Sequence, residues 1–358
     1  MYITLMAGGV GTRFWPLSRR SRPKQLLKII GSKSMLRLTF ERIRPLTESE
    51  KILIITNMEL KKDIEQELPE LPPENIIGEP QGRNTAPCIG LAAAVIKTRA
   101  GEDEVMVVLP ADHLISNTEN FRSTIKIGVD FATKHDTLIT LGIKPTYPET
   151  GYGYIQISDL LSKQKRKSIY KVRTFAEKPN METAERFLKS GDFFWNSGIF
   201  IWKIGKILKE MDEYLPELRS DVEKIAQSVN KKTFKKVVGE VYSHTKPISI
   251  DYGVLESSED VSVIAADFNW NDIGSWEAVY NISPKDNRGN VIHADKNILV
   301  NAHNNYFYAK NKIIAAIDVE DLVVVDMDDA VLICRKEMSQ NVKSVVDQLV
   351  RKRLNKYL

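Results

Sequence analysis

The sequence of 358 residues contains only two cysteines, Cys88 and Cys334, which lie far apart and form no CxxC pair. This excludes a disulfide scaffold and a cysteine-based zinc site. We interpret both cysteines as reduced core residues, which indicates a cytoplasmic protein. Neither a G-x-S-x-G segment nor a Cys/His nucleophile pattern is present, so hydrolases of those classes are also disfavoured.

Long apolar runs and a large excess of one charge are absent as well. No apolar segment approaches the roughly 20 residues that cross a bilayer. The first residues have neither the basic region nor the apolar region of a signal peptide. The net charge is only +4, and the short Lys/Arg-rich segments lack interleaved aromatic residues. We therefore expect no membrane span and no nucleic-acid partner.

A glycine-rich loop follows the first apolar run, Ile3 to Leu5, but it lacks the two familiar nucleotide motifs. Residues 8–13 read G-G-V-G-T-R. A dinucleotide-binding loop would read G-x-G-x-x-G, and a P-loop would end in Gly-Lys-Ser/Thr. The pattern therefore disfavours hydride transfer and P-loop ATP hydrolysis.

The same loop is nevertheless suited to phosphate. Its glycines let backbone N–H groups approach an anion. Arg13 and Lys24 add permanent positive charge nearby. This combination favours a triphosphate whose charge is neutralised during attack at phosphorus. The alternative is a tight strand–helix turn with surface charges.

Apolar strands alternate with amphipathic helices over the first 150 residues. Near-continuous Val/Ile/Leu strands indicate a parallel sheet covered on both faces. The sequence therefore predicts an α/β fold with a doubly wound, mostly parallel, Rossmann-like sheet. The predicted strands are 3–5, 51–56, 76–78, 104–109 and 137–143, and the predicted helices are 34–44, 61–68, 85–99 and 121–134.

The pattern changes after residue 150, where strands have fewer helices between them. A polar turn at 284–288 predicts a boundary between a domain at 1–283 and a small domain at 284–358. Short strands within 289–334 indicate an all-β domain, with a β-helix as one arrangement, closed by a helix at 337–353. The other predictions are strands at 152–157, 169–177 and 198–202, and helices at 181–190, 206–211 and 218–238.

Two aspartates are candidate metal ligands. Asp112 follows a buried strand, at the edge where open α/β sheets bind ligands, and one carboxylate there suits Mg²⁺. Asp272 is either a second Mg²⁺ ligand or the N-cap of a helix that begins near Ser275. His113 is not expected to join Asp112, because adjacent strand residues point to opposite faces.

Three polar clusters, at 149–153, 177–179 and 195–198, each place carboxylate, amide or glycine N–H groups at a predicted strand end. Together they would suit the hydroxyls of a sugar, and Lys178 its phosphate. Asp251 belongs to the same class. Each cluster taken alone is more often a turn.

The motifs resemble those of the sugar-phosphate nucleotidylyltransferases, and in detail the mannose-1-phosphate guanylyltransferase branch. The likeness is strong over residues 1–280 and loose beyond them. It is carried by the G-G-x-G-x-R loop with P-K-Q at 23–25 and by F-W-P-L-S at 14–18, E-P-Q-G-R-N-T-A-P at 79–87, L-P-A-D-H at 109–113, E-T-G-Y-G-Y-I at 149–155, F-W-N-S-G at 194–198 and W-N-D-I-G at 270–274.

The resemblance implies that GTP and α-D-mannose 1-phosphate give GDP-mannose and pyrophosphate by in-line attack on the α-phosphorus, assisted by Mg²⁺. A phosphate nucleophile needs no general base, so alignment and charge neutralisation remain for the enzyme. By resemblance, the nucleotide-binding residues are Gly8, Gly9, Gly11, Glu79, Asn84, Thr85 and Ala86. The catalytic residues are Arg13, Lys24 and Asp112, the metal ligands are Asp112 and Asp272, and the sugar-phosphate-binding residues are Gly151, Glu177, Lys178, Asn196 and Asp251.

Two alternatives stay open. The chain could be a pyrophosphorylase for another nucleotide or sugar phosphate, or a catalytically silent paralogue that binds GDP-mannose and regulates a partner. Longer members of the branch continue into a cupin-type isomerase domain, for which this chain leaves no room, so we expect no isomerase activity. A homodimer is one option for its assembly, with the small domain as a dimer contact or docked onto the catalytic domain.

Overall fold

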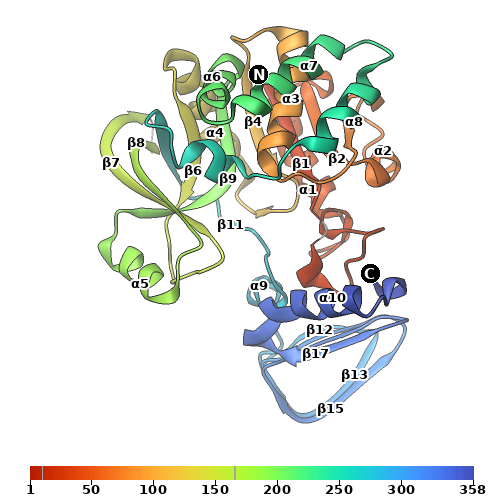
Figure 1. Ribbon diagram of the computed structural model, residues 1–358. Helices are drawn as coiled ribbons and strands as arrows, with labels where there is room; N and C mark the ends of the chain where they lie inside the picture. Colours follow the sequence, from red (N-terminus) through yellow and green to blue (C-terminus); the bar gives the residue numbers. More distant parts are fainter. Residues whose placement is uncertain (10, 165–166) are drawn as a thin grey trace. The chain divides into compact units, whose positions relative to one another are not determined.

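The computed structural model describes residues 1–9, 11–164 and 167–358, and its contacts divide the chain into two compact units (Figure 1). The sheet unit comprises residues 1–8, 40–111 and 115–270. The β-helix unit comprises residues 9–39, 112–114 and 271–358. Neither unit is continuous in sequence, because residues 9–39 belong to the same unit as residues 271–358. The domain boundary at residue 284 stays a prediction.

The sheet unit is built on a nine-stranded sheet of order β3-β2-β1-β4-β9-β6-β10-β8-β7. The first four of these strands are mutually parallel, as are β6 and β10. Strand β9 runs antiparallel to both β4 and β6. The strands are β1 (Tyr2–Ala7), β2 (Ile52–Asn57), β3 (Ile76–Glu79), β4 (Val105–Pro110), β6 (Leu138–Ile143), β7 (Gly153–Gln164), β8 (Lys167–Glu177), β9 (Phe193–Lys203) and β10 (Val261–Ala266).

Helices cover both faces of this sheet, which confirms the predicted α/β class. The α-helices in the first 250 residues are α1 (Met35–Ile43), α2 (Lys61–Glu67), α3 (Thr85–Ala100), α4 (Thr118–Lys134), α5 (Met181–Ser190), α6 (Ile204–Tyr214), α7 (Pro216–Ser228) and α8 (Phe234–His244). Within the described part of the chain, no helix combines the length and apolar character needed to cross a membrane.

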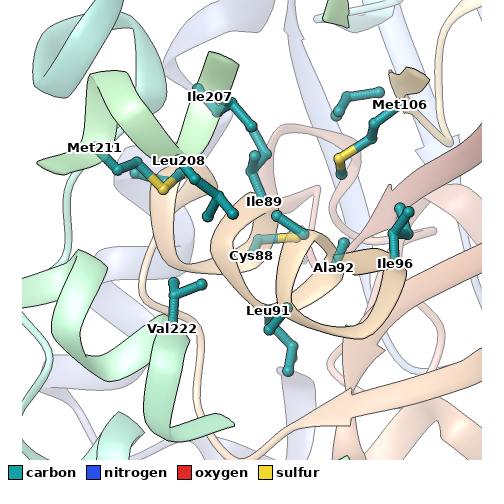
Figure 2. Packing of buried hydrophobic residues seen from close by; sticks show 14 of the residues in the cluster. Cys88, Ile89, Leu91, Ala92, Ile96, Met106, Ile207, Leu208, Met211 and Val222 are labelled. Carbon is teal, nitrogen blue, oxygen red and sulfur yellow. The ribbon is translucent and has the colours of Figure 1, made fainter. Parts of the chain in front are cut away.

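Helix α3 forms the centre of the main core. It is apolar around most of its circumference, as expected of a helix enclosed by other elements. Figure 2 shows Cys88 and Leu91 of α3 among Leu208 and Met211 of α6 and Val222 of α7. The packing is tight at Gly90, because a Cβ there would lie 2.7 Å from Val222.

The opposite face of the sheet is covered by α4. Successive side chains of β9 point to opposite faces of the sheet. Phe200 and Trp202 belong to the core around α3. Ile201 between them faces α4, where a Cβ on Gly128 would lie 2.4 Å from its Cδ1. Both faces are therefore buried, in agreement with the apolar strands of the sequence.

Two sequence predictions differ from the structure. The single helix predicted at 218–238 is instead two helices, α7 and α8. The chain turns between them at Asn230, whose φ of 66° lies in the left-handed region and ends a helix. The strand predicted at 198–202 begins earlier, so the segment 195–198 lies inside β9 rather than at a strand end.

The β-helix unit stacks short strands on one another in successive coils. Val291 of β12 pairs in parallel with Tyr306 of β14, which pairs in parallel with Val323 of β16. The predicted small β-helical domain ending in a helix is thereby confirmed. Its elements are β12 (Val291–His293), β13 (Lys296–His303), β14 (Tyr306–Ala309), β15 (Ile313–Glu320), β16 (Leu322–Asp326), β17 (Val331–Arg335), α9 (Trp276–Ile282) and α10 (Val342–Arg351).

Two buried asparagines join the coils of the β-helix. Asn305 donates from Nδ2 to Asn290 Oδ1 at 3.0 Å and to the Val319 carbonyl at 3.1 Å. Its Oδ1 accepts from the Leu322 N–H at 2.9 Å. Each coil is thus bonded to the next through side chains as well as through the strands.

Replacing Asn305 by leucine should therefore destabilise this unit. The substitution removes three hydrogen bonds and takes the asparagine partner away from the Val319 carbonyl and the Leu322 N–H, which should lower the free energy of unfolding by roughly 2–4 kcal/mol. Denaturant unfolding measures the effect, with Asn297→Leu on the exposed side of β13 as the control. Equal midpoints for the two variants would contradict the structural role of Asn305.

Candidate active site

The glycine-rich loop and the segment that carries Asp112 leave the sheet from neighbouring strand ends. Met6 of β1 lies in parallel register with Pro110 of β4, and the Ala111 N–H donates to the Met6 carbonyl at 3.0 Å. The chain continues from β1 into Gly8 and from Ala111 into Asp112. This is the carboxyl edge at which open α/β sheets bind their ligands.

In the β-helix unit, the loop packs directly against Lys24. Gly11 has a φ of 67°, and a Cβ there would lie 2.4 Å from the Cβ of Lys24. Only glycine combines this conformation with this approach. The Ser18 hydroxyl donates to the Gly11 carbonyl at 2.7 Å and holds the turn.

The ammonium of Lys24 joins the two aspartates expected to bind metal. Its Nζ lies 2.9 Å from Asp112 Oδ2 and donates to the backbone carbonyl of Asp272 at 2.6 Å. Burial opposes ionisation of Asp112, but the charges of Lys24 and His113 and the hydrogen bond from Lys24 together outweigh it and lower the pKa of that carboxyl below its ordinary value. Asp112 is therefore ionised at neutral pH.

The alternative role of Asp272 as a helix cap is excluded. Helix α9 is capped by Ser275, whose side chain accepts from the Ala278 N–H at 3.2 Å. The expectation that the side chains of His113 and Asp112 point to opposite faces is wrong, because His113 Nε2 lies 3.9 Å from Asp112 Oδ1. That His113 takes no part in metal binding stays a prediction. Strand β4 ends at Pro110, so the alternation of a strand no longer applies to these residues.

The carboxylate oxygens here are ligands of the kind that a hard divalent cation such as Mg²⁺ prefers. Among the residues that the structure describes, no three His, Cys, Asp or Glu side chains gather as a metal cluster. Mg²⁺ needs only one or two protein carboxylates, because it keeps water and phosphate oxygens as its other ligands. Asp112, with a side chain 32% exposed, is an ionised oxygen ligand open to such a complex.

Arg13 lies one turn from the loop, in the short helix η1 (Thr12–Phe14). It forms no ion pair with any residue in the described ranges and is half-buried. The following segment is anchored within the same unit: Trp15 donates from Nε1 to the Tyr357 carbonyl at 2.8 Å, and the Phe14 and Trp276 rings lie 5.2 Å apart. Arg13 is thus a cation available for an anion on a fixed support.

In the sheet unit, Glu79 ends β3 as a buried carboxyl group with a raised pKa. Tyr242 of α8 donates to its Oε1 at 2.9 Å. Burial raises the pKa of Glu79 to about 7, although the Tyr242 hydrogen bond acts to lower it. A buried carboxyl group that titrates near neutral pH is a functional candidate.

The residues after Glu79 are tied to the segment 248–250. Asn84 has a φ of 70° and caps α3 by accepting from the Thr85 N–H at 2.9 Å. The Thr85 hydroxyl accepts from the Ile250 N–H at 2.8 Å. The Ala86 N–H donates to the Ile248 carbonyl at 3.1 Å. The strained backbone at Asn84 is therefore held by the bonds of the two residues that follow it.

A second group of polar residues is centred on Asn196 of β9. Its Nδ2 donates to Asp251 Oδ1 at 2.7 Å. Its Oδ1 accepts from the Thr140 hydroxyl at 3.0 Å and from the Gly198 N–H at 3.2 Å. The two donors fix the orientation of the amide, so its NH₂ group faces Asp251.

Glu177 and Lys178 belong to the same group. A Cβ on Gly153 would lie 2.4 Å from Glu177 Oε2 and 3.4 Å from the Asn196 Cβ, and Lys178 forms an ion pair with Glu177. Burial and the charge of Glu177 raise the pKa of Asp251 to about 6. Convergent carboxyl, amide and ammonium groups are what a polyhydroxylated phosphate ligand requires.

Among the predicted site residues, Gly151 and Gly9 make few contacts with the residues around them. Gly151 is exposed, and its N–H donates to Glu149 Oε1 at 2.8 Å. Nothing lies within 4 Å of a Cβ built on Gly9. Conversely, sequence reasoning missed Thr140 and Tyr242. They lie in a strand and a helix without any motif, so no local signal marks them.

Two family models match the chain in sequence. The nucleotidyl transferase model matches residues 3–289, and the MannoseP isomerase/GMP-like beta-helix domain model matches residues 295–349. The first alone covers well over half of the chain. The second agrees with the stacked strands of the β-helix unit.

Curated relatives and a solved structure give the same family. A mannose-1-phosphate guanylyltransferase from Escherichia coli is 38% identical to this chain, and the match covers 96% of this chain and 75% of the relative. One from Klebsiella pneumoniae is 40% identical, and the match covers 99% of this chain and 74% of the relative. A structure from Thermus thermophilus, described as a mannose-1-phosphate geranyltransferase, has a TM-score of 0.87 at 30% identity and covers 97% of this chain and 98% of its own. This chain therefore belongs to the nucleotidyl transferase family, in its mannose-1-phosphate guanylyltransferase branch.

Proposed function

We propose that this protein transfers GMP from GTP to α-D-mannose 1-phosphate and releases pyrophosphate. The observation that carries the proposal is the Lys24 ammonium, which pairs with the Asp112 carboxylate and donates to the Asp272 backbone carbonyl directly beside the glycine-rich loop. This group of charges suits the α-phosphorus of a nucleoside triphosphate. The guanylyltransferase relatives support the choice of GTP and mannose 1-phosphate.

Nucleotide binding is assigned to the loop glycines and to the segment at the start of α3. Gly8, Gly9 and Gly11 receive the phosphates through backbone N–H groups. Glu79 borders the guanine from the end of β3, together with Asn84, Thr85 and Ala86. The bonds from Thr85 and Ala86 to Ile250 and Ile248 keep this border in one conformation.

The chemical step needs charge neutralisation rather than proton abstraction. Arg13 and Lys24 stabilise the pentavalent phosphorus and the departing pyrophosphate. Asp112 and Asp272 would hold Mg²⁺, which when bound supplies Lewis-acid stabilisation of the phosphate oxygens. The bond from Lys24 to Asp112 aligns the ammonium in advance and limits the reorganisation required during the reaction.

The sugar phosphate is assigned to the group around Asn196. Asn196 and Asp251 offer an ordered amide–carboxylate pair for hydroxyl groups, with Glu177 beside them. Lys178, more than half exposed, is suited to the phosphate of the sugar. Gly151 is the remaining member, on the exposed turn before β7.

Two alternative functions would use much of the same structure. A pyrophosphorylase for another base or sugar differs only in a few contacts near Glu79 and Asn196. A silent paralogue would bind GDP-mannose without catalysis, but Arg13, Lys24, Asp112 and Asp272 are all present, which argues against it.

The proposed location is the cytoplasm, which the two free cysteines, Cys88 and Cys334, support. The proposed assembly is a homodimer.

A substrate panel tests the assignment directly. Pyrophosphate release is measured with GTP, ATP, UTP and dTTP, each with mannose 1-phosphate and with glucose 1-phosphate, in the presence and absence of Mg²⁺. We expect GTP with mannose 1-phosphate and Mg²⁺ to be the fastest combination. A faster rate with another nucleotide would refute the guanylyl assignment, and nucleotide binding without turnover of any pair would favour the silent paralogue.

Removing either charge of the Lys24–Asp112 pair should slow the chemical step. We expect Lys24→Met and Asp112→Asn each to lower kcat by roughly 100-fold or more, because each removes transition-state stabilisation. Lys134→Met and Asp130→Asn alter an exposed ion pair on α4 and should leave kcat unchanged. A wild-type rate in either test variant would contradict the proposed mechanism.

Glu79 should make GTP binding depend on pH near 7. Only the ionised carboxyl group offers its full set of acceptor oxygens to guanine. We therefore expect kcat/KM for GTP to fall as the pH drops below about 7, the pKa of Glu79. Both substrates carry phosphates that also titrate, so the profile is compared with that of Glu79→Gln, which should lack this component. Identical profiles would remove Glu79 from base binding.

The raised pKa of Glu79 also predicts how the Glu79→Gln substitution affects stability, which serves as a control for folding. Because Glu79 ionises less readily when folded than when unfolded, it destabilises the fold by roughly 3 kcal/mol above pH 7, and this cost disappears below about pH 4.5. Glu79→Gln should therefore be no less stable than the wild type at pH 8. A lowered melting temperature there would show that reduced activity reflects misfolding.

A further inference from the structure

Strands β2 and β3 end side by side with two polar residues in register. Asn57 is the last residue of β2 and pairs in parallel with Glu79, the last residue of β3. Both side chains reach toward Gly8. A Cβ built on Gly8 would lie 3.4 Å from Glu79 Oε2 and 3.8 Å from Asn57 Oδ1. Two oxygen acceptors thus approach the backbone at the start of the glycine-rich loop.

The orientation of the Asn57 amide is fixed by the loop itself. Its Nδ2 donates to the Gly8 carbonyl at 3.1 Å, which leaves Oδ1 as the remaining polar atom. That oxygen is buried and accepts no hydrogen bond from the described part of the chain. A buried acceptor without a donor is unfavourable, and in native proteins it calls for an explanation.

The orientation of Glu79 is fixed from the opposite side. The Tyr242 hydroxyl donates to Oε1, so Oε2 is the oxygen directed toward Gly8. Tyr242 is itself held, because its carbonyl accepts from Gln81 Nε2 at 2.6 Å and from Arg83 Nε at 3.1 Å. The result is a pair of acceptors, Glu79 Oε2 and Asn57 Oδ1, that both approach Gly8.

Such a pair is complementary to one nucleobase. Guanine presents two adjacent donors, N1–H and the 2-amino group, on its pairing edge. Adenine and cytosine present one donor beside an acceptor, and uracil and thymine present one donor between two acceptors. A site of buried acceptors discriminates strongly, because a base that lacks the donors leaves them unpaired.

We propose that Asn57 is a specificity-determining residue that, together with Glu79, reads the donor edge of guanine, and that Tyr242 positions Glu79 for this task. The inference rests on the proposed function in one respect, that GTP is the nucleotide. It adds a residue to which no sequence motif points, and it gives a physical reason for the choice of base.

The test compares nucleotides that differ in this edge. ITP lacks the 2-amino group, and ATP lacks both donors. We expect the wild type to prefer GTP over both, and Asn57→Ala to lower the GTP/ATP ratio of kcat/KM at least tenfold while KM for mannose 1-phosphate stays unchanged. The GTP/ITP ratio then tells which donor Asn57 reads. Tyr242→Phe should lower the GTP/ATP ratio more weakly and mainly through KM.

A merely structural role gives a different result. If Asn57 only supports the Gly8 carbonyl, Asn57→Ala weakens GTP, ITP and ATP by the same factor and leaves both ratios intact, which would overturn the inference. Asn57→Ser is assayed in parallel in case the alanine variant does not fold. Asn120→Ala, which loses a bond to Asp267, is the control and should change neither ratio.

The proposed function and this inference fail separately. A wild type that does not turn over GTP with mannose 1-phosphate refutes the proposed function itself. A wild type that prefers GTP, with an Asn57→Ala variant that keeps the same preference, refutes only the role of Asn57. Melting temperatures of all variants are measured under the assay conditions.

Discussion

The buried ammonium of Lys24 is the interaction on which the candidate site depends. It neutralises Asp112, bonds the backbone at Asp272 and fills the space that Gly11 leaves without a side chain. Three segments far apart in sequence are therefore fixed by one cation. A buried lysine without such partners would be strongly unfavourable.

Much of this arrangement could be predicted from the sequence, for clear physical reasons. The apolar strands, the glycine-rich loop and Asp112 at a strand end are local patterns, and local patterns determine which elements form. The two helices α7 and α8 were predicted as one, because the break depends on a single Asn230 in a left-handed conformation. The sequence leaves two roles open for Asp272, and the cap at Ser275 excludes only the capping role.

Other parts of the site depend on contacts that no local pattern encodes. Thr140 orients Asn196 across two strands, and Tyr242 reaches Glu79 from a helix more than 160 residues away. Their importance comes from register and packing, which are tertiary properties. Glu79 and Asp251 also have raised pKa values. Such buried acids reduce stability, and proteins tend to retain them where a ligand benefits.

The bond from the Trp15 indole to the Tyr357 carbonyl has a consequence for how such proteins can evolve. The residues that follow the glycine-rich loop are part of the same hydrophobic cluster as the stacked coils and the terminal helix. The C-terminal third is therefore not an interchangeable module. A recombination event that replaced it would also have to supply new partners for Phe14 and Trp15, so the two ends of the chain are constrained to change together.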